Sequence, residues 1–160
     1  MKFLVSIVGW AGFLMFAGSG FLSAQVVSLH TGWTLYPAYD VRREADKIQV
    51  GLPHTWNAED VFGRINYRRE AMVYQKKLPV PKEWAGKRLF LYFEGVNSVA
   101  DVFVNGKRAG GHAGGYTAFC MEITDFITPG QEALLAVWVS NAYRTDVLPL
   151  SGDFNVYGGI

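Results

Sequence analysis

The 160-residue chain contains a single cysteine, Cys120, so no intrachain disulfide can form. Apolar packing must therefore hold the fold together. Cys120 lies between Phe119 and Met121, and its sequence neighbours include no base that could activate a thiol. A free cysteine in an apolar run is most simply a small hydrophobic side chain. We therefore predict that Cys120 is buried in the core and has no catalytic role.

Concentrated charge of one sign is also absent. The formal net charge is +1, and the basic residues are scattered as short pairs such as Arg42-Arg43 and Lys107-Arg108. A nucleic-acid-binding protein normally gathers positive charge on one face. Pairs spread this evenly are typical of solvated strand ends. We therefore expect no nucleic-acid partner.

The usual motifs of cofactor, metal and nucleophile sites are missing as well. The glycine-rich stretch 110–116, "GGHAGGY", lacks the G-x-G-x-x-G spacing of a phosphate-binding loop, and there is no G-x-S-x-G. The histidines stand far apart in sequence, which disfavours a zinc site. Glu59 and Asp60 lie in an expected loop, where acids are usually solvated, and no carboxylate has neighbours that would raise its pKa. We therefore predict no cofactor, no metal and no catalytic residue in this chain.

The first 24 residues differ in composition from the rest. Lys2 is followed by an apolar run of about 20 residues that ends in "SAQ". A positive charge followed by an apolar run and then by small residues is typical of a secretory signal, with cleavage expected after Ala24. The run is also long enough to span a bilayer, so a retained anchor is the alternative. Either interpretation predicts an exported protein, periplasmic or extracellular, with no other contact with a membrane.

From Gln25 onward, short apolar runs rich in Val, Phe, Tyr and Trp are separated by Gly, Pro, Asn and Asp. Such runs favour half-buried strands. The expected strands are residues 26–30, 33–36, 71–78, 88–96, 99–104, 107–111, 118–123 and 133–140. Helical periodicity is nearly absent. The pattern predicts an all-β fold with one domain over 25–160, a jelly-roll β-sandwich of two packed, mostly antiparallel sheets.

Three local signals refine this prediction. In 88–93 ("RLFLYF") and 134–139 ("LLAVWV") both alternating sets of residues are apolar, so these strands should be covered on both faces and lie centrally. Asn105-Gly106 suits a two-residue hairpin turn. Residues 124–130 ("TDFITPG") favour a short helical turn, capped by Thr124 and stopped by the Pro-Gly pair.

The closing stretch 151–160, "SGDFNVYGGI", combines an acid, two aromatic residues, an amide and a Gly-Gly pair. A carboxylate accepts hydrogen bonds from vicinal hydroxyls, and aromatic rings pack on the apolar faces of sugars. Asp153, with Asn155 in the same loop, is therefore a candidate sugar-binding group. The alternative is a surface loop whose aromatic side chains pack against the edge of the sandwich.

The chain resembles a known family. Three stretches carry the resemblance: "LPHTWN" (52–57), residues 67–124 with the V-N-G hairpin and the H-x-G-G-Y-x-x-F run, and the closing D-F-N-x-Y-G-G-I. Together they look like the N-terminal sugar-binding domain of glycoside hydrolase family 2, which includes β-galactosidases, β-glucuronidases and β-mannosidases. The family's Phe-x-x-Asp-x-Thr becomes Phe119 to Thr124 with Glu122 in the acidic position, which keeps the carboxylate.

The resemblance implies a galactose-binding-domain-like jelly roll that precedes an immunoglobulin-like domain and a (β/α)-barrel. In the family the two catalytic glutamates of a retaining mechanism lie on that barrel, and nothing in this chain matches them. The aspartate of the closing motif, which in the family binds the hydroxyls of the terminal sugar, corresponds to Asp153. The role of Asn155 is less defined. The expected partner is thus a terminal β-linked sugar, bound together with the missing barrel domain.

The resemblance also implies a fragment. In the family the closing Gly-Gly-Ile continues into a further strand, so we expect residues 25–160 to lack their final strand and to leave an open sheet edge. The chain alone is then expected to be inactive. Two other functions remain open: a stand-alone carbohydrate-binding module, and a structural domain whose closing loop contacts protein.

Overall fold

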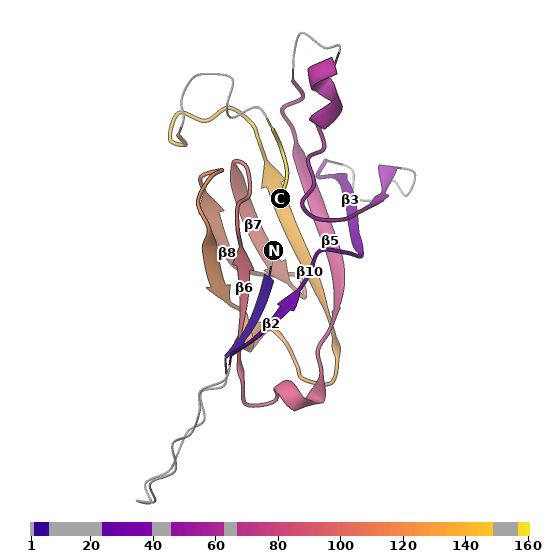
Figure 1. Ribbon diagram of the computed structural model, residues 1–160, viewed down its shortest axis with the longest axis vertical. Helices are drawn as coiled ribbons and strands as arrows, with labels where there is room; N and C mark the ends of the chain where they lie inside the picture. Colours follow the sequence, from indigo (N-terminus) through magenta and orange to yellow (C-terminus); the bar gives the residue numbers. More distant parts are fainter. Residues whose placement is uncertain (1, 7–23, 40–45, 63–66, 149–156) are drawn as a thin grey trace, which may run out of the picture.

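The computed structural model describes residues 2–6, 24–39, 46–62, 67–148 and 157–160, with 2–6 described by their backbone alone (Figure 1). The strands are β1 (Lys2–Ser6), β2 (Ala24–Ser28), β3 (Trp33–Pro37), β4 (Ile48–Val50), β5 (Ala71–Pro79), β6 (Arg88–Phe93), β7 (Val99–Val104), β8 (Lys107–Ala113), β9 (Phe119–Glu122) and β10 (Glu132–Ser140). Short 3₁₀ helices are η2 (Ala58–Phe62), η3 (Lys82–Trp84) and η4 (Thr124–Phe126). No helix among these residues is long and apolar enough to cross a bilayer.

The described strands form two sheets, and the paired strands are antiparallel in both. One sheet has the order β2-β1-β6-β9 and the other β4-β3-β5-β10-β7-β8. The predicted all-β sandwich is therefore confirmed, and each predicted strand overlaps an observed one. The sequence pattern did not predict β4, which has only three residues, or β1, which lies in the stretch assigned to the signal.

The core lies between the two sheets and is built by strict alternation. Leu89, Leu91 and Phe93 of β6 are at most 1% exposed, and they belong to the same apolar cluster as Leu135 and Val137 of β10. β6 lies between β1 and β9, and β10 lies between β5 and β7. The central positions predicted for both strands are confirmed. The prediction that both faces are covered was wrong, since Phe90 and Tyr92 of β6 are only partly buried and Leu134 of β10 is 40% exposed.

The Asn-Gly hairpin is confirmed as well. Asn105 and Gly106 both have positive φ angles, 51° and 78°, between β7 and β8. The Asn105 side chain also joins the turn to its neighbours: its Nδ2 donates to the Phe126 carbonyl (2.9 Å), and its Oδ1 accepts from the Leu134 amide (2.8 Å). The turn is therefore fixed by its own backbone preference and by contacts with two other segments.

Two other local predictions were wrong. Cys120 is exposed, because β9 is an edge strand of period two in which Phe119 and Met121 pack against the core and the residue between them faces outward. A helical turn does follow β9, but it ends at Phe126, and its N-cap is Ile123, which makes no side-chain cap bond. The Thr124 hydroxyl instead accepts from the Leu89 amide (2.9 Å) and ties the turn to β6.

Adjacent residues of β10 provide a matched test of the core. Leu135 is fully buried, whereas Leu134 is 40% exposed. We expect Leu135→Ala to lower the free energy of unfolding by about 2–5 kcal/mol, because it leaves a cavity between the sheets. Leu134→Ala should cost less than about 1 kcal/mol. Urea unfolding of the two variants and the parent chain measures the difference, and equal losses would contradict the assignment of the two faces.

The carboxylate of Glu122 links β9 to β6. It accepts hydrogen bonds from Arg88 (3.0 and 2.5 Å) and from the Thr124 hydroxyl (2.8 Å). These bonds, those of Arg88 first, lower the pKa of Glu122 from 4.5 to about 2. A carboxylate with a lowered folded-state pKa stabilises the fold above its unfolded pKa, and the contribution is lost as the pH falls from about 4.5 toward 2.

We therefore expect Glu122→Gln to be less stable than the parent chain at pH 7, with the gap closing as the pH falls toward 2. Parallel unfolding curves at pH 7, 4 and 2.5 measure it. Because the pair is solvent-exposed, the effect should be small and should shrink in high salt. A gap that does not change with pH would show that the ion pair does not contribute.

Candidate functional site

The two candidate sugar-binding residues, Asp153 and Asn155, lie in 149–156, outside the described residues. The structure does describe both ends of that segment, up to Leu148 on one side and from Tyr157 on the other. The contacts of these two ends define where the candidate loop leaves and rejoins the sandwich.

Residues 157–160 are held by backbone hydrogen bonds on two sides, with isolated β-bridges at Gly159. The His54 amide donates to the Ile160 carbonyl (2.8 Å) and the Ile160 amide donates back to the His54 carbonyl (3.1 Å). On the other side the Asn97 amide donates to the Gly159 carbonyl (3.1 Å). Gly159 thus pairs antiparallel with both Thr55 and Asn97. The end of the closing motif is fixed by backbone bonds from two segments that are far apart in sequence.

The Gly-Gly pair of the closing motif is required because residues 54–56 leave no room for a side chain at either position. A Cβ on Gly159 would lie 1.9 Å from the His54 carbonyl oxygen, and a Cβ on Gly158 would lie 2.1 Å from the ring of Trp56. Both distances are far below van der Waals contact. Only glycine lets this segment lie flat against residues 54–56, which explains the pair that stands out in the sequence.

Side chains complete the attachment. Asn57 Oδ1 accepts from the Gly158 amide (2.9 Å), and Asn97 Nδ2 donates to the Tyr157 carbonyl (2.5 Å). The Tyr157 hydroxyl donates to the Gly115 carbonyl (2.8 Å). Burial, and to a smaller extent the neighbouring Tyr116, raises the pKa of Tyr157.

A buried carboxylate lies behind this attachment. Asp60, in η2, is 1% exposed and accepts from the Arg68 amide (2.8 Å) and from Arg68 Nε (3.3 Å). The same guanidinium donates to the Trp56 carbonyl. The prediction that Asp60 is solvated was wrong, although its neighbour Glu59 is exposed as expected. An arginine eight residues away compensates the buried charge, and sequence composition alone does not show that pairing.

The Arg68 carbonyl joins the end of β10 to the residue that holds the closing motif. It accepts from Asn57 Nδ2 (3.3 Å) and from Asn141 Nδ2 (3.0 Å). Asn141 follows directly after β10, before the loop, and Asn57 holds Gly158, after it. The stretch between Asn141 and Gly158 is therefore attached at both ends to one polar network, which we call the anchor network: Asn57, Asp60, Arg68 and Asn141.

An open depression of about 530 Å³ lies beside the ends of the loop. It is lined by Ala113, Gly114, Tyr116, Thr117, Asp146, Val147 and Leu148. Tyr116 is 56% exposed and makes an edge contact with Tyr157, with ring centroids 5.9 Å apart. An exposed aromatic ring next to small residues and a few polar groups is the kind of surface that contacts the apolar face of a sugar.

His54 and His112 lie in different parts of the structure and make different contacts. His54 Nδ1 lies 2.9 Å from the Tyr74 hydroxyl, and burial lowers the pKa of His54 and raises that of Tyr74. His112 stacks on Phe119 and contacts the Thr117 hydroxyl at 2.9 Å. Among the residues that the structure describes, no three His, Cys, Asp or Glu side chains come together as a metal site.

Comparison with known proteins now identifies the class. Residues 24–160 match the family model described as glycosyl hydrolases family 2, sugar binding domain. The chain belongs to this family.

Its relatives include a β-glucuronidase of Bacteroides fragilis, 46% identical over 92% of the chain, and a β-galactosidase of Thermoanaerobacter pseudethanolicus, 32% identical over 87%. A solved β-glucuronidase from Bacteroides uniformis superposes on 85% of the chain with a TM-score of 0.78 and 34% identity, over 17% of its own length. The chain spans about a fifth of the length of the two enzymes, 21% and 20%.

Sequence reasoning located the closing motif but missed its anchor network. The family stretches that carry the resemblance already contain part of it, because "LPHTWN" ends in Asn57 and the next stretch opens at residue 67, just before Arg68. The pairing of these residues with Asp60 and Asn141 depends on long-range contacts.

The anchor network predicts unequal effects for two adjacent acids. Asp60→Ala removes the buried acceptor of the Arg68 amide and guanidinium, and we expect a loss of about 1–3 kcal/mol in the free energy of unfolding, because Arg68 is 44% exposed and keeps Glu70 at 3.6 Å. Glu59→Ala, at an exposed position, should change it by less than about 0.5 kcal/mol. Chemical unfolding measures both. If the two variants are equally stable, Asp60 does not support the loop.

Proposed function

We propose that this chain is the N-terminal, non-catalytic domain of an exported, retaining β-glycosidase of family 2, and that its closing loop orients the terminal sugar through Asp153, assisted by Asn155. The observation that carries the proposal is that the stretch between Asn141 and Gly158, which contains this loop, is attached to the anchor network at both ends. A loop fixed at both ends can hold a carboxylate in place, and preorganised contacts of this kind lower the entropy cost of aligning a substrate.

The proposed substrate is a terminal β-linked sugar, a β-glucuronide or a β-galactoside. The relatives support this class, since the proteins that match the chain carry the names β-glucuronidase and β-galactosidase. In this proposal the chemistry takes place on a barrel domain outside the chain, where two glutamates act as acid/base and nucleophile. The present domain forms one wall of the sugar cleft and is inactive alone.

The depression beside Tyr116 extends this wall. Its lining is largely apolar, and the ring of Tyr116 stands next to Tyr157, whose hydroxyl is held by the Gly115 carbonyl. We place the apolar face of the sugar, or the group attached to it, along this ring, with the hydroxyls directed toward the loop. Export follows from the leader-like composition of the first 24 residues.

We expect Asp153→Ala in the longer enzyme to lower kcat/KM by at least about tenfold, since the carboxylate would hold hydroxyls at the reacting sugar. Steady-state kinetics with aryl β-glucuronides and aryl β-galactosides measure the loss. The matched control is Glu83→Ala, in η3, where an exposed acid is removed. Thermal unfolding should place both variants within about 2 °C of the parent, which corresponds to no more than about 1 kcal/mol. Unchanged kinetics for Asp153→Ala would contradict the proposal.

A further inference from the structure

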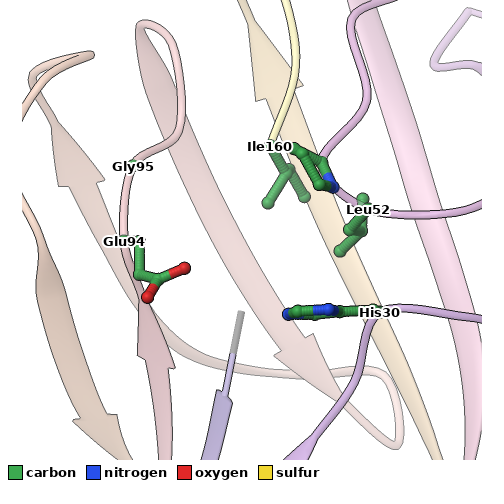
Figure 2. Close-up of a pocket in the computed structure, with 6 residues that line it drawn as sticks. His30, Leu52, Glu94, Gly95 and Ile160 are labelled. Carbon is green, nitrogen blue, oxygen red and sulfur yellow. The ribbon is translucent and has the colours of Figure 1, made fainter.

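Hollows of different character adjoin the closing motif. Ile160 lines a pocket of about 190 Å³ together with His30, Leu52, Pro53, Glu94 and Gly95. Figure 2 shows His30 and Glu94 on opposite sides of this pocket, and its described lining includes no tryptophan, tyrosine or phenylalanine. The depression beside Tyr116 is larger, about 530 Å³, and contains an exposed aromatic ring. Its volume lies in the range of pockets that hold small ligands, about 300–1,000 Å³. Of these two hollows, the depression is the better candidate for a ligand site.

The ring of Tyr116 is exposed, but the chain on both sides of it is held. Before it, the Gly115 carbonyl accepts from the Tyr157 hydroxyl (2.8 Å). After it, Thr117 Oγ1 lies 2.9 Å from His112 Nε2. An aromatic surface on a backbone that is already held loses little conformational freedom when a ligand packs against it. Tyr116 therefore offers a positioned platform for an apolar face.

A carboxylate held in one orientation lines the same depression. Arg144 Nε and Nη2 donate to the two carboxylate oxygens of Asp146 (2.8 and 2.5 Å), and the Asp146 side chain is still 63% exposed. An ionised carboxylate has about four acceptor positions, so Asp146 can accept from the hydroxyls of a ligand while Arg144 holds it. The depression thus combines an aromatic platform with an oriented hydrogen-bond acceptor.

The depression adjoins the candidate loop at both ends. Val147 and Leu148 line the depression and directly precede residues 149–156. The ring of Tyr116 contacts that of Tyr157, which directly follows the same residues, with the ring centroids 5.9 Å apart. A group attached to a sugar that the loop binds would therefore have this surface beside it.

We propose that the depression binds a second sugar residue, the one to which the terminal sugar is β-linked, so that the substrate is the end of a disaccharide or of a longer glycan. Tyr116 packs on the apolar face of this leaving sugar, and Asp146 accepts from its hydroxyls. The inference rests on the proposed function, because it takes the terminal sugar to be bound by Asp153.

The carboxylate of Asp146 favours a sugar over an aromatic leaving group. An aromatic group also packs well on a tyrosine ring. A plain aromatic ring, however, has no hydroxyl to donate to Asp146, and it would displace water from the carboxylate without replacing the hydrogen bonds. A sugar satisfies the ring and the carboxylate together, since it has an apolar face and several hydroxyl donors.

The test measures kcat/KM of the longer enzyme on three substrates with the same terminal sugar: its β-linked disaccharide with glucose, its phenyl β-glycoside and its methyl β-glycoside. The set is made with terminal glucuronic acid and with terminal galactose. The methyl group is small and has no hydroxyl, so the methyl glycoside reports on the terminal sugar. The variants are Tyr116→Ala and Asp146→Ala. Their matched controls are Tyr39→Ala and Asp125→Ala, at an exposed tyrosine and an exposed aspartate that do not line the depression.

We expect Tyr116→Ala and Asp146→Ala each to lower kcat/KM at least about fivefold more for the disaccharide than for the methyl glycoside, because each removes a contact with the leaving sugar only. Asp146→Ala should also lower it more for the disaccharide than for the phenyl glycoside. The two controls should leave all three substrates within about twofold of the parent. Thermal unfolding of each variant checks that the fold is retained.

Three results would overturn the inference. Equal losses on the disaccharide and the methyl glycoside would show that Tyr116 and Asp146 support the domain or the terminal sugar. Unchanged kinetics on the disaccharide would show that the depression does not bind a second sugar. A loss in Tyr116→Ala that is largest for the phenyl glycoside would show that it takes an aromatic group instead. The proposed function fails separately, when Asp153→Ala leaves the kinetics on the methyl glycoside unchanged.

Discussion

Gly158 and Gly159 lie so close to residues 54–56 that neither has room for a Cβ, and the position of the closing segment depends on this contact. Backbone hydrogen bonds reach the closing segment from two sides: His54 and Trp56 bond with Ile160 and Gly158, and the Asn97 amide donates to the Gly159 carbonyl. A side chain at either glycine would force these backbones apart. The lack of space for a side chain requires glycine at both positions, and the backbone hydrogen bonds then fix the direction of the segment. The candidate loop rejoins the sandwich at this point.

The charged and polar groups around this contact act as a support. Asp60 is buried, so its charge needs Arg68, and the peptide carbonyl of Arg68 in turn accepts from Asn57 and Asn141. A network of this kind has one well-defined arrangement, because leaving any buried member unpaired is costly. It joins the end of β10 to the closing motif. The residues on both sides of the candidate loop are therefore held in place by one network.

Local pattern predicted most of the sandwich. Alternation in "RLFLYF" and "LLAVWV" gave both the strands and their central positions, and Asn105-Gly106 gave the hairpin, because these signals are decided by the nearest few residues. The wrong predictions for Cys120 and Thr124 concern side chains whose surroundings depend on a neighbouring strand. Cys120 looks buried from its apolar neighbours, yet β9 is an edge strand and the residue faces outward. Thr124 looks like a cap, yet its hydroxyl accepts from the Leu89 amide across the sheet.

The sequence alone determined the strand pattern, the hairpin and the closing motif with Asp153 and Asn155. The alternation of apolar residues, the preferences of turn residues and short motifs all depend on residues that are adjacent in the sequence. Only the tertiary structure decided that Asp60 is buried against Arg68, that Gly158 packs against Trp56, and that Ile160 lines one pocket with His30. These facts join residues that are 8 to more than 100 positions apart. Their pairing depends on how the two sheets close over the core, and that arrangement is a property of the folded chain.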